Sequence, residues 1–145
     1  MRTVQRKRVL ITGSGRGIGR ALARRFAADG AEIVISDVDP VAVEAAVEEL
    51  RGAGGKALGV ELDVTDPVSI AAARDRVHAE AGPIDILVNN AGTVHGGPFL
   101  DVPLERHLLT YKINVDGVVA VTHAFLPDLV AGDGGHLVNI ASASG

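Results

Sequence analysis

Short apolar runs alternate with amphipathic stretches along the whole chain. Five runs are apolar throughout or nearly so, which is typical of strands buried on both faces of a sheet. They are Lys7–Thr12, Glu32–Ser36, Ala57–Leu62, Ile84–Val88 and His136–Ala141. The stretches between them with helical periodicity are Gly17–Asp29, Pro40–Arg51, Pro67–Glu80 and, approximately, Leu104–Ala131. This alternation predicts βαβ units, and therefore an α/β fold with a doubly wound parallel sheet between two helical layers.

The last helical stretch is the longest, and we expect it to break near Thr110–Tyr111 into a short helix and a longer one. The longer helix should end near Asp128. Its main stripe is predicted to face the core and comprises Val115, Val118, Val119, Thr122, Phe125, Leu126 and Leu129. A second face of small residues, which could accept a neighbouring helix, comprises Gly117, Ala120 and Ala124.

Composition narrows the class of protein. The chain has 145 residues, 47% of them apolar and 22% charged, with a net charge of -4 and no cysteine. These values predict one folded domain over residues 1–145, without disulfides or thiolate metal sites, in a reducing cytoplasm. The five histidines have no ligand spacing, so we expect no metal. Mild acidity argues against nucleic acid, and no apolar run approaches the roughly 20 residues that a membrane span needs.

A glycine-rich turn follows the first predicted strand directly and opens the first helix. It runs Thr12-Gly13-Ser14-Gly15-Arg16-Gly17-Ile18-Gly19. Glycine permits a tight bend and close approach of a pyrophosphate, while the helix N-terminus offers free N–H groups and the positive end of its dipole. The position within a βαβ unit is the context that a dinucleotide site requires. The predicted binding residues of this turn are Gly13, Arg16, Gly17, Ile18 and Gly19.

Asp37 closes the second predicted strand and bears on the choice of cofactor. A carboxylate there can accept hydrogen bonds from the adenosine ribose hydroxyls and would repel a 2'-phosphate, by about 4 kcal/mol at ~4 Å and an effective dielectric constant near 20. NAD is therefore favoured over NADP. Arg16 is a counter-signal, because its guanidinium could pair with a 2'-phosphate or with the pyrophosphate. The plain alternative is that Asp37 is a solvated residue approaching a helix.

Two motifs resemble those of the short-chain dehydrogenase/reductase family. Thr12, Gly13, Gly17 and Gly19 match the glycine signature T-G-x-x-x-G-x-G, and Asn89-Asn90-Ala91-Gly92 matches the signature N-N-A-G after the fourth strand. The resemblance runs from Val9 to the last residue. It implies a three-layer Rossmann-like fold with about five strands in the order 3-2-1-4-5, incomplete relative to the family. The last strand would then be a bare edge, so we expect a homo-oligomer.

The resemblance also implies roles for residues on later elements. Asp63 and Val64 look like the adenine contact, while Asn90, Ala91 and Gly92 belong to the cofactor site. The catalytic candidates are Asn114, which would bind a water of the proton relay, and Ser142, which competes with Ser144. The alternatives are a plain turn for residues 90–92, a helix cap for Asp63, a helix-bending residue for Asn114 and a loop serine for Ser142.

The family's general acid is a Tyr with a Lys four positions later, and this sequence departs from that pattern. Its only tyrosine, Tyr111, is followed directly by Lys112 and has the wrong spacing. The implied activity is hydride transfer between NAD and a small-molecule secondary alcohol or ketone, with this segment as the cofactor-binding part. The rival interpretations are a dinucleotide-binding module without turnover and a methyltransferase that uses a similar glycine turn.

Overall fold

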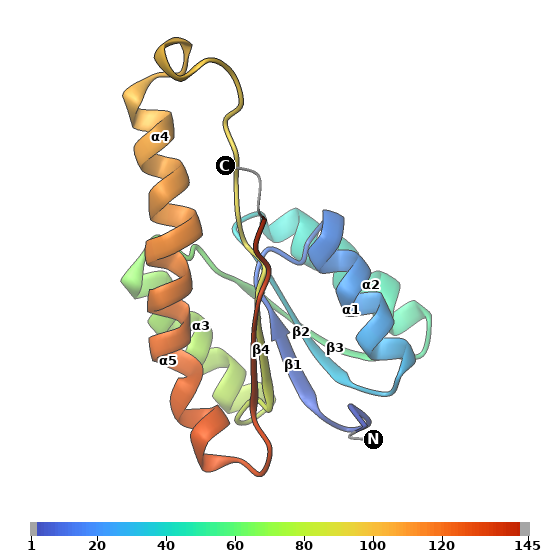
Figure 1. Ribbon diagram of the computed structural model, residues 1–145. Helices are drawn as coiled ribbons and strands as arrows, with labels where there is room; N and C mark the ends of the chain where they lie inside the picture. The colour runs from blue at the N-terminus through green and yellow to red at the C-terminus, as the bar shows by residue number, and fades with distance from the viewer. Residues whose placement is uncertain (1–2, 143–145) are drawn as a thin grey trace.

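A five-stranded parallel sheet forms the centre of the computed structural model, which describes residues 3–142 (Figure 1). The strands lie in the order β3-β2-β1-β4-β5, which confirms the predicted order. Their bounds are Arg8–Ile11 for β1, Glu32–Asp37 for β2, Lys56–Glu61 for β3, Ile86–Asn89 for β4 and His136–Asn139 for β5. The fourth strand begins two residues later than predicted, and the fifth is shorter.

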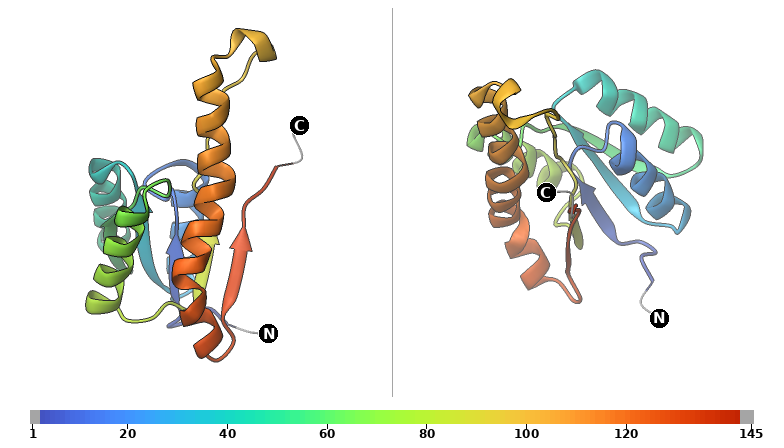
Figure 2. Two further views of the ribbon diagram at one scale, coloured as in Figure 1. Left: turned by 90° about the vertical axis from the view of Figure 1, so that its left-hand side faces the viewer. Right: turned by 45° about the horizontal axis from the view of Figure 1, so that its top comes forward.

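Helices cover both faces of the sheet (Figures 1 and 2). The helices α1, Gly17–Ala28, and α2, Pro40–Gly52, lie on one face, and α3, Pro67–Glu80, and α5, Gly117–Ala131, lie on the other. Successive strand residues point to opposite sides of a sheet. Leu10 therefore packs toward α3 and α5, whereas Val9 and Ile11 pack toward α1 and α2. The result is a three-layer α/β fold of the Rossmann-like type.

The long helical stretch is continuous, so the expected break near Thr110–Tyr111 is wrong. An α-helix α4, Leu104–Tyr111, runs into a π-helical segment η2, Lys112–Asp116, and then into α5. A π-helical turn accommodates an extra residue within the helix without ending it. The helix also continues past Asp128 to Ala131 and ends where the backbone of Gly132 becomes extended. A short 3₁₀ turn η1, Phe99–Asp101, precedes α4.

The buried face of α5 agrees with the predicted stripe only in part, because Phe125 and Leu129 are buried and other stripe residues are not. Gly117, Val121, Phe125 and Leu129 are buried, while Val119 is 65% exposed. The predicted stripe residues Val115 and Leu126 are also exposed. The small face is the one that meets the body of the protein, because a Cβ at Gly117 would lie 2.7 Å from Val64 Cγ2. Small side chains let this helix approach closely, and Ala120 and Ala124 on the same face pack beside α3, which agrees with the expectation that this face could accept a neighbouring helix.

The continuous helix Leu104–Ala131 is long and apolar enough to cross a membrane by length and composition alone. Core helices of globular proteins pass the same test. In this fold Val121, Phe125 and Leu129 of the helix are buried in the core cluster beside α3 and β4. The other side of the helix, together with the β5 edge, leaves apolar side chains exposed, among them Leu137 and Val138.

Candidate cofactor-binding site

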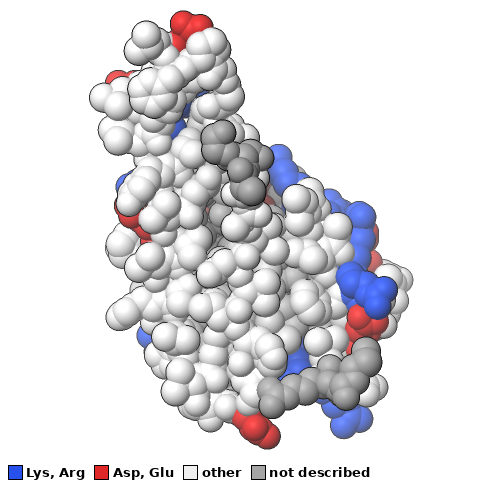
Figure 3. Space-filling model, in the orientation of Figure 1, with Lys and Arg blue, Asp and Glu red and all other residues white. Residues whose placement is uncertain are grey.

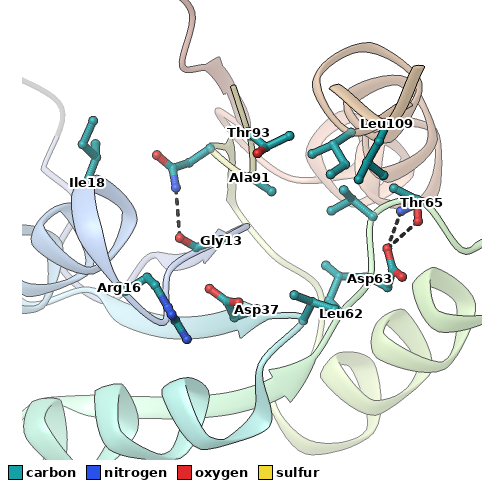
Figure 4. A pocket seen from close by; sticks show the side chains of 15 residues that line it. Gly13, Arg16, Ile18, Asp37, Leu62, Asp63, Thr65, Ala91, Thr93 and Leu109 are labelled. Atoms are coloured by element: carbon teal, nitrogen blue, oxygen red, sulfur yellow. Dashed lines mark hydrogen bonds between the residues drawn. The ribbon is translucent and has the colours of Figure 1, made fainter. Parts of the chain in front are cut away.

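A pocket of about 560 Å³ lies where the carboxyl ends of the central strands meet the long helix (Figure 4). In doubly wound sheets this edge is where ligands bind. Nine of the predicted site residues line the pocket, namely Gly13, Arg16, Ile18, Asp37, Asp63, Val64, Asn90, Ala91 and Gly92. The structure therefore brings together one group of residues from four separate loops.

The turn after β1 has the backbone shape that glycine provides. Gly13 has φ +61°, and a Cβ placed there would lie 2.8 Å from the Cα of Ala91. Gly17 has φ +57°, and within the described part of the chain no neighbouring atom lies within 4 Å of the position that a Cβ would take. Gly13 is therefore required by close packing against the loop after β4. Gly17 is required by its left-handed conformation, in a place that stays open to a ligand.

The N-terminus of α1 opens directly from this turn. Its N-cap residue is Arg16, and among residues 3–142 no side chain caps the first N–H groups of the helix. Its first turn, from Gly17 to Arg20, contains no acidic residue. Uncapped N–H groups and the helix dipole favour an anion at such a position. A diphosphate fits this end of the pocket in both charge and hydrogen-bonding capacity.

Thr12 joins the glycine turn to the loop after β4, a role that the sequence motifs alone did not reveal. Its buried hydroxyl Oγ1 accepts hydrogen bonds from the N–H of Asn90 at 3.0 Å and of Ala91 at 2.9 Å. In return, the Asn90 side-chain amide donates to the carbonyls of Thr12 at 3.0 Å and Gly13 at 3.1 Å. The two signature motifs are thus one hydrogen-bonded unit, which fixes the floor of the pocket.

Asp37 lies at the end of β2 with its side chain toward the pocket (Figure 4). The residue is 9% exposed. Its Oδ2 accepts a hydrogen bond from Gly15 N at 3.1 Å, and its Oδ1 accepts one from Asp39 N at 3.2 Å. Each carboxylate oxygen has more than one acceptor position, so a ribose diol can still donate to this group. Backbone donors hold the carboxylate in place before any ligand arrives.

Arg16 lines the same end of the pocket, beside Asp37 (Figure 4). Its guanidinium forms an ion pair with the carboxylate of Asp39, the N-cap residue of α2. The Arg16 side chain is 67% exposed. The cation that could meet a 2'-phosphate is therefore already paired with a carboxylate.

The other end of the pocket is formed by the loop after β3 (Figure 4). Asp63 Oδ1 accepts hydrogen bonds from the N–H of Thr65 at 2.8 Å and from its hydroxyl at 2.7 Å. The N–H of Asp63 donates to Ser69 Oγ at 2.9 Å. These bonds fix the shape of the loop, and neighbouring Leu62 and Val64 give the pocket an apolar wall. An apolar wall beside a carboxylate fits a flat ring that bears an exocyclic amine.

Asn114 lies in the π-helical segment and bonds to the loop after β4. Its Oδ1 accepts a hydrogen bond from Thr93 N at 2.9 Å, and its Nδ2 donates to Thr93 O at 2.8 Å. Ser142 follows β5 and is exposed, while Ser144 lies outside the described residues. As far as residues 3–142 show, the pocket lining does not include Asn114 or Ser142. Asn114 thus lies beside the pocket lining at Gly92 and Thr93, and neither catalytic candidate forms the wall.

Several lining residues had no signal in the sequence. Some are sequence neighbours of predicted site residues and could have been included by adjacency, whereas Leu109 and Ile113 come from the long helix. The contribution of these two depends on how that helix crosses the end of the sheet. The additional lining residues are Val38, Leu62, Thr65, Thr93, Leu109 and Ile113.

The chain belongs to the short-chain dehydrogenase/reductase family. Residues 7–145 match the family model described as short chain dehydrogenase. The chain is 47% identical over 135 residues to the probable oxidoreductase EphD of Mycobacterium tuberculosis, covering 92% of this chain and 23% of the relative. It is 42% identical over 139 residues to the oxidoreductase UcpA of Escherichia coli, covering 96% of this chain and 52% of the relative. The chain thus spans about half the length of UcpA, and less of EphD.

Solved structures agree with this assignment. A hydroxysteroid dehydrogenase from Escherichia coli superimposes with a TM-score of 0.89 at 34% identity, over 97% of this chain and 59% of that one. A 7α-hydroxysteroid dehydrogenase complexed with NADH and 7-oxo glycochenodeoxycholic acid has the same TM-score and identity, over 97% of this chain and 55% of that one. The family uses NAD(P), and the second of these structures contains NADH.

Proposed function

We propose that this chain is the NAD-binding part of an oxidoreductase that transfers hydride between the nicotinamide and a secondary alcohol or ketone. The observation that supports it most strongly is the position of the Asp37 carboxylate. It is held by two backbone N–H groups in the same pocket as the open end of α1. A diphosphate group and a ribose diol have complementary chemistry to these two features.

Each part of the pocket has a separate task in this proposal. The turn from Gly13 to Gly19 and the start of α1 bind the diphosphate. Asp37 accepts hydrogen bonds from the adenosine ribose hydroxyls, and the loop at Asp63 and Val64 holds the adenine. The nicotinamide, when bound, supplies the carbon that accepts or donates hydride. The protein's contribution is to bind and orient the dinucleotide at the carboxyl edge of the sheet.

Asn114 and Ser142 supply the second part of the proposal. Asn114 positions the loop after β4 through its double hydrogen bond to Thr93, and it would hold a water of the proton relay once the relay is complete. Ser142 would donate a hydrogen bond to the substrate oxygen. The family's Tyr and Lys pair, which moves the proton, has no counterpart within this sequence. The 7-oxo compound in the complex of the related 7α-hydroxysteroid dehydrogenase supports a ketone as the substrate class.

Calorimetric titration with NAD, NADP and S-adenosylmethionine tests this function directly. We expect the chain to bind NAD, to bind NADP at least tenfold more weakly and not to bind S-adenosylmethionine. Asp37→Ala should weaken NAD binding and reduce the discrimination against NADP. Glu61→Ala, at an exposed carboxylate on the adjacent strand β3, serves as the matched control and should leave both affinities unchanged. Equal affinity of the intact chain for NAD and NADP would refute the role of Asp37.

A further inference from the structure

Four arginines lie at the beginning of α1 and along it, namely Arg16, Arg20, Arg24 and Arg25. On the side of the molecule that carries α1, basic and acidic side chains lie next to one another (Figure 3). Each of these arginines has a carboxylate partner: Arg20 and Arg24 pair with Glu49, Arg25 pairs with Asp29, and Arg16 pairs with Asp39. Only the last of these pairs involves a residue that lines the pocket. If Asp37 binds the adenosine ribose as proposed, the pair of Arg16 and Asp39 lies beside the position that a 2'-phosphate would take.

We propose that Asp39 is a second specificity-determining residue, which excludes NADP by holding the Arg16 guanidinium. This inference rests on the proposed NAD-binding function. Without Asp39, Arg16 would be a cation beside the ribose, available to a 2'-phosphate. With Asp39, the same cation is already paired with a carboxylate.

Asp39 is well placed for this task because the start of α2 fixes its side chain. Its Oδ1 accepts hydrogen bonds from the N–H groups of Val41 at 3.0 Å and Ala42 at 3.3 Å, and its Oδ2 pairs with Arg16. The Ala42 N–H lowers the pKa of the Asp39 carboxyl most, and the Val41 N–H and the charge of Arg16 lower it further against the opposing effect of burial. The group is therefore an anion with a fixed direction at neutral pH.

Asp39 also orients Asp37, the residue proposed above to favour NAD. The backbone N–H of Asp39 donates to Oδ1 of Asp37. Asp39 thus holds Asp37 with its main chain and Arg16 with its side chain. Only the second of these interactions depends on side-chain charge, so the two can be separated by substitution.

The sum of the nearby charges indicates how neutralising Asp39 changes the affinity for NADP. Asp37, Asp39 and Arg16 together carry one net negative charge, and a 2'-phosphate adds up to about two more. Neutralising Asp39 brings the local net charge to zero and leaves Arg16 unpaired. Both Arg16 and Asp39 are partly exposed, so solvent screens the interaction and the expected change is modest. We expect about a fivefold gain in NADP affinity, with NAD still preferred because Asp37 remains.

Asp39→Asn is the informative variant, because Asn caps a helix about as well as Asp while carrying no charge. Its effect should be measured by calorimetry with NAD and NADP in the native background and in the Arg16→Gln background. If Asp39 acts through Arg16, Asp39→Asn lowers the ratio of the NADP to the NAD dissociation constant about fivefold only where Arg16 is present. Asp39→Ser, a second neutral cap, should reproduce the change.

Asp29→Asn is the matched control. It removes the ion pair of Asp29 with Arg25, which has similar exposure and lies on the same helix away from the pocket. The ratio of the NADP to the NAD dissociation constant should stay unchanged. An Asp39→Asn effect that is equal with and without Arg16, or that is absent, overturns the inference while NAD binding still supports the proposed function. Failure of the native chain to bind NAD overturns both. Thermal unfolding of each variant confirms that the comparison is between folded proteins.

Discussion

Replacement of Thr12 by valine should destabilise the protein by removing the acceptor that joins the two signature motifs. The Thr12 side chain is 2% exposed, and valine has nearly the same shape. The change therefore leaves the N–H groups of Asn90 and Ala91 without their partner while altering the packing little. Any loss of stability therefore comes from removing one oxygen atom, Oγ1 of Thr12.

The magnitude follows from the number of donors left unpaired. Each buried donor that loses its partner costs about 1 to 3 kcal/mol. Asn90 and Ala91 are only half-buried, which allows some access of water and places each cost toward the lower end of that range. We expect Thr12→Val to lower the free energy of unfolding by about 2 to 4 kcal/mol. Thr12→Ser keeps the hydroxyl, loses one buried methyl and should cost only about 1 kcal/mol.

Urea unfolding monitored by circular dichroism distinguishes the two variants. The urea midpoint of Thr12→Val should fall by about 1 to 2 M relative to the native chain, with an unchanged denaturant slope. Thr12→Val should also weaken NAD binding, because the floor of the pocket depends on the same bonds. If Thr12→Val proves as stable as Thr12→Ser, the hydroxyl does not join the motifs and the reasoning is refuted.

Three further outcomes are expected. Gly15→Ala should weaken NAD binding at least tenfold, because a Cβ there would lie 2.8 Å from Ala42 Cβ and 3.0 Å from Asp37 Oδ2 and would displace the carboxylate; unchanged affinity by calorimetry would contradict this. Asp128→Asn should cost about 1 to 3 kcal/mol in urea unfolding, since this carboxylate is 8% exposed and pairs with His78 at 2.8 Å; His78→Gln in the same assay should account for part of that loss. The 145-residue chain should reduce NAD with no secondary alcohol, because Ser142 cannot act as the general acid or base; turnover equal to that of a version extended through a Tyr-x-x-x-Lys motif would contradict this.

The sheet could be predicted from the sequence because its signals are local. Continuous apolar strands indicate burial on both faces, and the glycine turn with the motif after β4 identifies the family, which implies the strand order. The long helix was less predictable. Its buried face includes the close approach of Gly117 to Val64, a tertiary contact that the apolar pattern does not indicate. A π-helical turn likewise has no sequence signature as clear as a proline or a glycine.

The pocket shows the same difference between local signals, which the sequence reveals, and tertiary contacts, which it does not. Residues within the motifs, such as Gly13 and Asn90, lie together in the pocket lining, because a motif fixes local backbone shape. The hydrogen bonds of Thr12 and the ion pair of Arg16 with Asp39 join residues that are distant in the sequence. Only the packing of one loop against another shows these interactions. For that reason the residues around the pocket could be predicted from the sequence better than the contacts between them.

The central claim is that a dinucleotide binds at the carboxyl edge of the sheet, against the glycine turn and Asp37. Titration of the isotopically labelled chain with NAD, followed through its backbone amide resonances, tests this most directly. The amides of Gly15, Gly17 and Asp37 should shift together and saturate, while those of Lys7 and His136, at the opposite end of the sheet, should stay in place. Saturable shifts at Lys7 and His136, or none at the glycine turn, would contradict the account.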